Sequence, residues 1–241
     1  MSIPSGELLV PDRVRVLARG ASVFAVWRNE LGGTTFRTDD GRFIKHQPRN
    51  AETSAAGEAE RLTWAAPHVR VPRVIEWGAD DSEEWMVTAA LPGTSAVGSR
   101  WAADPAVAVR AVGEGLRALH DSLPVDDCPF DWSVPARIDK AGRRGIRLPP
   151  ELHTPPPIDR LVVCHGDACC PNTLLDDDGR WVAHVDLGSL GVADRWADIA
   201  VAAMSTTWNY GPGWEDALYE AYGIEPDAER IAYYRALWNE T

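Results

Sequence analysis

The sequence predicts an α+β protein of two lobes, a small antiparallel-sheet lobe followed by a mainly helical one. Residues 22–46 alternate β-forming runs with glycine turns, and several stretches after residue 104 carry apolar residues at helical spacing. The 241 residues suffice for two modest hydrophobic cores. Leu91-Pro92-Gly93 interrupts the pattern. We therefore expect an N-terminal lobe at residues 1–91 and a C-terminal lobe at residues 92–241.

The first lobe begins with a predicted antiparallel meander. We expect strands at residues 22–31, 34–38 and 42–46, separated by Gly32-Gly33 and by Asp39-Asp40-Gly41. The spacing of Ala55, Ala59, Leu62 and Ala66 predicts a helix over 52–66, which Pro67 ends. Two further strands are predicted at 71–77 and 84–89.

The second lobe is predicted to be helical around one embedded hairpin. Asp104-Pro105 is a typical helix start, and the apolar face that follows runs to about His120. Five prolines within residues 141–160 predict a loop or short helix and then an extended passage. A strand is expected at 161–164, a hairpin at 173–175 and 181–185, and helices at 196–206, 214–222 and 226–238.

Composition excludes several classes of protein. The net charge is −12, and no cluster of Lys and Arg is present, which argues against a nucleic-acid or anionic-membrane binder. The acidity is weakly compatible with a cationic ligand, although a solvated acidic surface that keeps the protein soluble is the better explanation. No run approaches the ~20 apolar residues of a membrane helix, and the first residues do not read as a signal peptide, so we expect a cytoplasmic protein.

The four cysteines do not form a recognisable metal or disulfide pattern. They are Cys128, Cys164, Cys169 and Cys170, without a CxxC pair or a His/Cys spacing typical of zinc. We expect reduced, partly buried thiols.

The strongest chemical signal is the segment from His165 to Asn172 with the downstream Asp186-Leu187-Gly188. Asp167 and Asn172 have the Asp-x-x-x-x-Asn interval of the protein-kinase catalytic loop, and Asp-x-Gly matches the metal-binding motif of those enzymes. A carboxylate can align an acceptor hydroxyl, while amide and carboxylate oxygens suit Mg²⁺. Each piece alone reads as a turn or cap, but the joint spacing favours phosphoryl transfer.

These segments make the sequence resemble the aminoglycoside phosphotransferase family, especially its 3′-type kinases. The matching segments are 163–167, Pro171-Asn172, 185–188, 193–200, Cys128-Pro129-Phe130, Tyr222-Gly223-Ile224 and Tyr233-Tyr234-Arg235. The resemblance implies a bilobal protein-kinase-like fold. It also implies Asp167 as the catalytic residue, and Asn172 and Asp186 as Mg²⁺ ligands.

The resemblance points to nucleotide-binding residues in the first lobe. Lys45 matches the lysine that holds the α- and β-phosphates, and Glu58 matches the helix glutamate that pairs with it, with Glu60 as the alternative. The loop of Gly32, Gly33 and Thr34 would cover the phosphates, although Gly-Gly is equally a plain hairpin turn. The backbone from Ala89 to Leu91 resembles the hinge that holds the nucleotide base.

Other positions are candidates for supporting the catalytic loop or for contacting the acceptor substrate. We expect Asp198 to accept backbone hydrogen bonds around the catalytic loop, and His165 to organise that loop rather than act as a base. Ser189 stands where many 3′-type kinases have an arginine, and the chain ends with Glu240-Thr241 rather than an acidic pair followed by aromatic residues. Ser189 and Glu240 are candidate acceptor contacts.

The sequence thus predicts an ATP- or GTP-dependent, Mg²⁺-requiring kinase of a small hydroxylated molecule. The acceptor implied is an aminoglycoside 3′-hydroxyl, with antibiotic resistance as the role. Another amino sugar, another antibiotic or a metabolite stays open, as does a catalytically silent nucleotide-binding regulator. No nucleic-acid, membrane or protein partner is implied.

Overall fold

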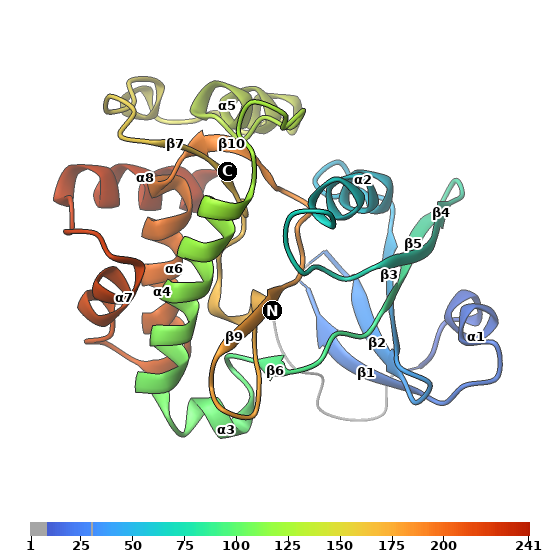
Figure 1. Cartoon of the computed structure of the whole chain (residues 1–241). Coiled ribbons are helices and arrows are strands. Elements are labelled where there is room, and N and C mark those ends of the chain that lie inside the picture. The colour runs from blue at the N-terminus through green and yellow to red at the C-terminus, as the bar shows by residue number, and fades with distance from the viewer. Residues whose placement is uncertain (1–8, 30) are drawn as a thin grey trace. The chain divides into compact units, whose positions relative to one another are not determined.

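The computed structural model describes residues 9–29 and 31–241 and divides the chain into two compact units. Unit 1 comprises Met1–Ala66 and Pro72–Leu91, and unit 2 comprises Pro67–Val71 and Pro92–Thr241. Both units mix helices and strands, so the α+β prediction is confirmed (Figure 1). No helix in the described ranges is both long and apolar enough to span a bilayer.

Unit 1 is built on a five-stranded antiparallel sheet with the strand order β1-β2-β3-β5-β4. Its elements are α1 (Asp12–Ala18), β1 (Val23–Arg28), β2 (Thr34–Thr38), β3 (Arg42–Pro48), α2 (Ala55–Ala65), β4 (Val74–Ala79) and β5 (Glu83–Ala89). The first three strands form the predicted meander, whereas β5 inserts between β3 and β4.

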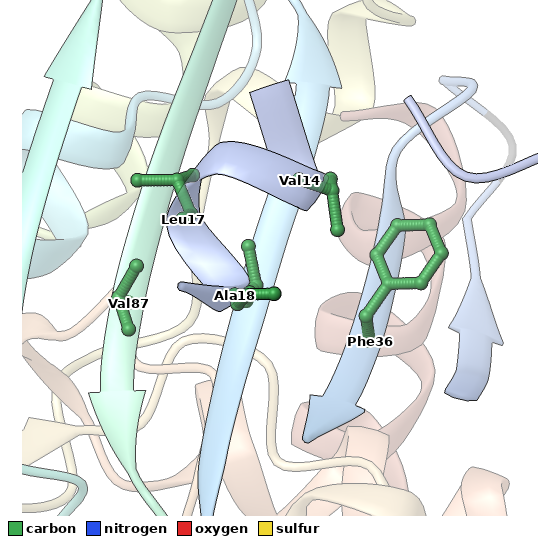
Figure 2. Packing of buried hydrophobic residues seen from close by; sticks show 6 residues of the cluster. Val14, Leu17, Ala18, Phe36 and Val87 are labelled. Carbon is green, nitrogen blue, oxygen red and sulfur yellow. The ribbon is translucent and has the colours of Figure 1, made fainter. Parts of the chain in front are cut away.

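Helix α1 was missed by the sequence analysis, yet it covers one face of this sheet. It is only seven residues long, and its apolar residues Val14, Leu17 and Ala18 are buried. Figure 2 shows them packed over the strands against Phe36 and Val87. Successive residues of a strand face opposite sides of the sheet. The residues next to Phe36 and Val87 along their strands therefore point to the other face.

Helix α2 begins three residues later than predicted. The side-chain oxygen of Asn50 accepts hydrogen bonds from the N–H groups of Glu52 and Thr53, which holds residues 50–53 in a turn. Ser54 then caps the helix by accepting a hydrogen bond from Gly57 N at 3.2 Å. The strand predicted at 71–77 is likewise displaced, because β4 begins only after Pro72, which lacks a backbone donor.

Unit 2 is mainly helical and carries two small sheets. Its elements are β6 (Thr94–Ser95), α3 (Ser99–Ala102), α4 (Pro105–Ser122), α5 (Val134–Arg143), η1 (Pro150–His153), β7 (Leu161–Cys164), η2 (Cys170–Asn172), β8 (Thr173–Leu175), β9 (Trp181–His184), β10 (Gly191–Asp194), α6 (Trp196–Tyr210), α7 (Glu215–Tyr222) and α8 (Ala228–Glu240). The hairpin and the last three helices follow the prediction. Strand β10 and most of α5 were not predicted.

Close helix packing explains the shape of the helical core. Helix α4 packs against α7 and β9, and α6 packs against α7 and α8 (Figure 1). A β-carbon on Gly113 of α4 would lie 2.8 Å from the Leu218 carbonyl of α7, so this glycine allows the two backbones to approach. Asp104 precedes α4 as expected but makes no side-chain capping bond.

Strands β7 and β10 pair in antiparallel register, with Cys164 opposite Gly191 and Leu161 opposite Asp194. Strand β8 pairs with both β6 and β9. The segment that joins β7 to β8 contains residues 165–172. The sequence's main motif therefore lies between two small sheets, where both of its ends are fixed.

Candidate active site

One buried carboxylate accepts hydrogen bonds from the start of the loop that runs from His165 to Asn172. Asp198, in the first turn of α6, accepts hydrogen bonds from His165 N at 2.5 Å and from Gly166 N at 2.9 Å. His120 of α4 approaches the same carboxylate, with Nε2 2.9 Å from Oδ2. Although burial opposes its charge, the pKa of Asp198 lies below the ordinary value because of these hydrogen bonds. The structural role expected for Asp198 is thus borne out by its contacts.

Both ring nitrogens of His165 form hydrogen bonds with the backbone. Nε2 lies 3.0 Å from the Val185 carbonyl, to which it can only donate, and Nδ1 accepts from Asp167 N at 3.3 Å. This pattern requires a neutral ring protonated at Nε2. With both nitrogens engaged, His165 organises the loop, as expected, and has no nitrogen left to act as a base.

Asp167 is a carboxylate without a full set of partners. Its Oδ1 atom is buried, and within residues 9–29 and 31–241 it has no hydrogen-bond partner. Burial, followed by the negative charge of nearby Asp186, raises the pKa of Asp167. A buried acceptor of this kind is stabilised by an incoming O–H donor, such as the hydroxyl of an acceptor substrate.

Asn172 and Asp186 are oriented so that oxygen atoms can meet a cation. Asn172 Nδ2 donates to the Asp167 carbonyl at 2.9 Å, so the amide Oδ1 is the atom that could bind a cation. The Asn172 carbonyl accepts from Val185 N at 3.0 Å and so fixes the next residue, Asp186. Asp186 has φ +65°, a left-handed conformation that is uncommon for a non-glycine residue and that clusters at functional sites.

These residues fit a divalent cation. Two carboxylates, Asp167 and Asp186, lie close enough for one to raise the pKa of the other, and the Asn172 amide contributes a neutral oxygen. Hard oxygen donors of this kind suit Mg²⁺, and a bound cation would relieve the repulsion between the two charges.

The loop after Asp186 packs directly against the catalytic loop. Gly166 has φ +81°, and a β-carbon there would lie 2.1 Å from the Ser189 carbonyl oxygen. Only glycine permits this contact. The structure therefore brings Ser189 next to the catalytic loop through its backbone.

In unit 1, the structure brings Lys45 and Glu58 together. Lys45 Nζ lies 2.5 Å from Glu58 Oε1, and Glu58 is 9% exposed. Lys45 is opposite Met86 in the register of β3 and β5, on the sheet face away from α1. Glu60, the alternative partner, is exposed. A fixed ammonium on a half-buried sheet face can bind phosphate oxygens.

The glycine loop of unit 1 is a tight turn. Gly33 N donates to the Asn29 side chain at 2.7 Å, and Asn29 N donates to the Gly33 carbonyl at 3.0 Å. Gly32 has φ +85°, and Thr34 begins β2. These contacts suit a hairpin turn as well as a phosphate-covering loop, so the nucleotide role of Gly32, Gly33 and Thr34 stays a prediction.

The expected hinge has few backbone groups to offer. Ala89 N donates to the Arg73 carbonyl and Ala90 N to the Gly41 carbonyl, both at 2.9 Å. These two N–H groups are therefore not available to a nucleotide base. The hinge role of Ala89 and Leu91 stays a prediction.

Glu240 lies apart from the catalytic loop in sequence and in its contacts. It is exposed in the last turn of α8, next to Thr241, whose hydroxyl and carbonyl oxygens accept hydrogen bonds from Arg137 of α5 and from Arg144, which follows that helix. None of the contacts of the described residues ties Glu240 to Asp167, and its acceptor role stays a prediction.

Two kinds of residue were not predicted from the sequence. Phe43 lies two residues before Lys45 on β3 and so shares its sheet face; the alternation of the strand would have indicated it. The chain of contacts from Asp198 through His120 to the Tyr222 hydroxyl, 2.8 Å from His120 Nδ1, has no local signal, because it joins three different helices.

One further cluster of metal-ligand types is present. The ligand atoms of His120, Cys164 and Asp198 all lie within 4.8 Å of one another. Both Asp198 oxygens, however, already accept hydrogen bonds that hold the catalytic loop. The cluster is better explained as support for that loop than as a metal centre.

Comparison with known proteins identifies relatives among phosphotransferases. Residues 14–234 match the model of the phosphotransferase enzyme family. An aminoglycoside 3′-phosphotransferase of Streptomyces fradiae is 41% identical over 228 residues, which cover 81% of this chain and 84% of that protein.

Solved structures agree with this match. The crystal structure of an aminoglycoside 3′-phosphotransferase of type VIII is 30% identical, with a TM-score of 0.78 over 95% of this chain and 98% of that one. A 3″-type aminoglycoside phosphotransferase from Streptomyces rimosus, in complex with ADP and streptomycin, is 27% identical, with a TM-score of 0.69 and the same coverage.

Proposed function

The chain belongs to the phosphotransferase enzyme family, and we propose that it transfers the γ-phosphoryl group of a nucleoside triphosphate to a hydroxyl of an aminoglycoside. The observation that carries this proposal is the loop of residues 165–172. It presents Asp167, with an unpartnered buried oxygen, beside the Asn172 amide and the Asp186 carboxylate.

Asp167 is the residue that aligns the acceptor. Its carboxylate accepts the hydrogen bond of the substrate hydroxyl, whose oxygen then forms a bond to the γ-phosphorus. The bond between that phosphorus and the β,γ-bridging oxygen breaks, the nucleoside diphosphate leaves, and the hydroxyl proton passes to Asp167. Since positioning dominates phosphoryl transfer, the fixed loop matters more than the basicity of this carboxylate.

Asn172 Oδ1 and the Asp186 carboxylate would hold Mg²⁺. A bound Mg²⁺ neutralises phosphate charge and orients the phosphates. The protein contributes the orientation: the Nδ2 bond of Asn172 to the Asp167 carbonyl and the left-handed backbone of Asp186 fix both oxygen donors before any ligand arrives.

Unit 1 supplies the nucleotide-binding groups in this proposal. Lys45, held by Glu58, binds the α- and β-phosphates, and the turn of Gly32, Gly33 and Thr34 covers them. Phe43, on the same sheet face as Lys45, offers an aromatic surface for the base, whose polar edge would meet the backbone of Ala89 and Leu91.

The acceptor is proposed to be an aminoglycoside phosphorylated at its 3′-hydroxyl. The names of the relatives from Streptomyces fradiae and of type VIII support this choice, and the net charge of −12 suits polycationic sugars. The Streptomyces rimosus protein binds streptomycin, so a 3″-hydroxyl is the alternative within the class. Antibiotic resistance would be the role.

An ADP-release assay tests the function. The purified chain is mixed with Mg-ATP or Mg-GTP and with aminoglycosides that carry or lack a 3′-hydroxyl, alongside streptomycin. We expect release of ADP or GDP that depends on the acceptor and on its 3′-hydroxyl, with NMR locating the phosphate. Stabilisation by nucleotide without turnover on any acceptor would instead support a silent regulator.

A further inference from the structure

Helix α6 contacts the catalytic loop at a second place besides Asp198. Ser205 lies seven residues after Asp198, about two helical turns, so both side chains emerge on the same face of α6. Ser205 is fully buried, and its hydroxyl oxygen accepts a hydrogen bond from Cys170 N at 2.9 Å. Asp198 thus holds the start of the loop, and Ser205 holds its second half.

The hydrogen bond from Cys170 N orients one peptide group. A peptide unit is planar, so the N–H of Cys170 and the carbonyl of Cys169 turn together. That carbonyl accepts a hydrogen bond from Asn172 N at 2.9 Å. One peptide group therefore connects the Ser205 hydroxyl to the backbone of Asn172, whose Oδ1 atom is a proposed cation ligand.

The Ser205 hydroxyl is itself fixed by Asn209, one turn further along α6. Asn209 Nδ2 donates to the Ser205 hydroxyl oxygen at 3.1 Å and to the Ser205 carbonyl at 2.8 Å. The hydroxyl oxygen thus receives two N–H donors, which occupy both of its lone pairs. Rotation of this side chain would break both hydrogen bonds, so the oxygen that Cys170 N meets has one preferred position.

We propose that Ser205 is a positioning residue, whose hydroxyl oxygen sets the Asn172 amide in place for the divalent cation through the peptide group before Cys170. This inference rests on the proposed role of Asn172 in the cation site. Asp198 accepts from N–H groups that precede Asp167, whereas Ser205 acts on residues that follow it. Loss of the Ser205 hydroxyl should therefore weaken cation binding more than acceptor binding.

Removal of this hydroxyl leaves a buried donor without an acceptor. Cys170 is fully buried, so no solvent is at hand to replace the lost oxygen. Ser95 of β6 donates to the Pro171 carbonyl at 2.8 Å, so it holds the next peptide group and does not supply the missing acceptor. The peptide group before Cys170 would turn toward another acceptor, and Asn172 N would lose its alignment with the Cys169 carbonyl.

The test compares Ser205→Ala with Thr206→Val as the matched control. Thr206 is the neighbouring fully buried residue of α6, and its hydroxyl donates to the Ala203 carbonyl of the same helix at 2.7 Å. Both changes remove one buried hydroxyl, but only S205A removes a contact with the loop. Asn209→Ala, which keeps the Ser205 oxygen but releases its orientation, is a second variant for the case that S205A does not fold.

Mn²⁺ is the probe, because it accepts the same oxygen ligands as Mg²⁺ and its binding can be measured without turnover. Water-proton relaxation reports Mn²⁺ immobilised on the protein in the presence of a non-hydrolysable ATP analogue. We expect Mn²⁺ affinity to fall about tenfold in S205A and about threefold in N209A, and to change less than twofold in T206V. In steady-state assays of S205A, the Mg²⁺ concentration for half-maximal rate should rise about tenfold, with the KM for the acceptor changed less than twofold.

A double variant tests whether Ser205 acts through Asn172. In an Asn172→Ala background, S205A should change Mn²⁺ affinity less than twofold, because the side chain that it positions is gone. Equal Mn²⁺ affinities in S205A and T206V, or a full S205A effect in the N172A background, would overturn the positioning role. Absence of acceptor-dependent release of a nucleoside diphosphate from the wild type would instead contradict the proposed function, and the Mn²⁺ affinities would still decide the role of Ser205.

Discussion

Replacing Asp198 by asparagine should disturb both stability and catalysis, because this one carboxylate holds the start of the catalytic loop. The amide oxygen can keep the Oδ2 position, which faces His165 N and His120 Nε2. The amide NH₂ then occupies the Oδ1 position against Gly166 N, where two donors meet. One charge-assisted hydrogen bond is lost, and two others become neutral ones.

The magnitude follows from these three contacts. A hydrogen bond to a charged group contributes about 1.5–3 kcal/mol and a neutral one about 0.5–1.5 kcal/mol, and relief of the buried charge offsets part of the difference. We expect the free energy of unfolding to fall by about 3 kcal/mol, which for this chain length lowers Tm by about 6–12 °C. Displacement of His165 and Gly166 should also reduce kcat by about a hundredfold.

Thermal unfolding and ADP release measure both effects. Asp126→Asn is the control, since Asp126 is exposed and the change removes the same charge. A Tm within 2 °C of the wild type, with unchanged kcat, would refute the claim that Asp198 supports the loop.

The remaining predictions concern other parts of the chain. Glu58→Gln should lower kcat/KM for ATP by about 10- to 100-fold, because Lys45 loses its charged partner, whereas Glu60→Gln, at an exposed position, should leave it unchanged in the same steady-state assay. Gly113→Ala should destabilise the protein by about 1–2 kcal/mol, since the new β-carbon would lie 2.8 Å from Leu218 O, whereas Gly142→Ala, with no atom within 4 Å of the new β-carbon, should stabilise it by about 0.5–1 kcal/mol; chemical denaturation gives both signs. Burial lowers the pKa of His184 to about 3, so the folded protein binds fewer protons than the unfolded chain below pH 6.5, and this group should cost about 2 kcal/mol of stability between pH 7 and pH 5; a His184→Phe variant with the same pH slope would contradict this.

Much of the fold could be predicted from local patterns. The strands of the meander are bounded by glycine turns, and the hairpin around Asp176-Gly179 has a turn with Gly179 at φ +76°. Helices α6 and α8 have enough turns for their periodicity to appear. Helix α1 has only seven residues, too few for a periodic signal, and the preceding Pro11 gives no side-chain cap.

Long-range pairing could not be predicted in the same way. Strand β10 is four residues long and is defined by its pairing with β7, and β5 lies between β3 and β4 although it follows both in sequence. Helix α5 begins at Val134, seven residues before the stretch in which a short helix was expected. Its Ser133 cap, which accepts from Ala136 N at 3.4 Å, was a local signal that the prolines further along obscured.

In the candidate site, too, some residues could be predicted from local sequence and others depend on tertiary packing. Asp167, Asn172 and Asp186 were predicted because phosphoryl transfer requires these residue types at a fixed spacing. Lys45 and Glu58 were predicted from the resemblance to the aminoglycoside phosphotransferase family, and the structure pairs their side chains. The left-handed backbone of Asp186 and the buried contacts of His120 depend on tertiary packing, which no local pattern reveals.

The most direct test of the central claim is the rate of phosphoryl transfer from Mg-ATP to an aminoglycoside that carries a 3′-hydroxyl, measured for the wild type and for Asp167→Asn. We predict acceptor-dependent ADP release by the wild type and a loss of at least about a hundredfold in kcat for the variant, with little change in the KM for ATP. A variant that transfers phosphate at near wild-type rate would contradict the account.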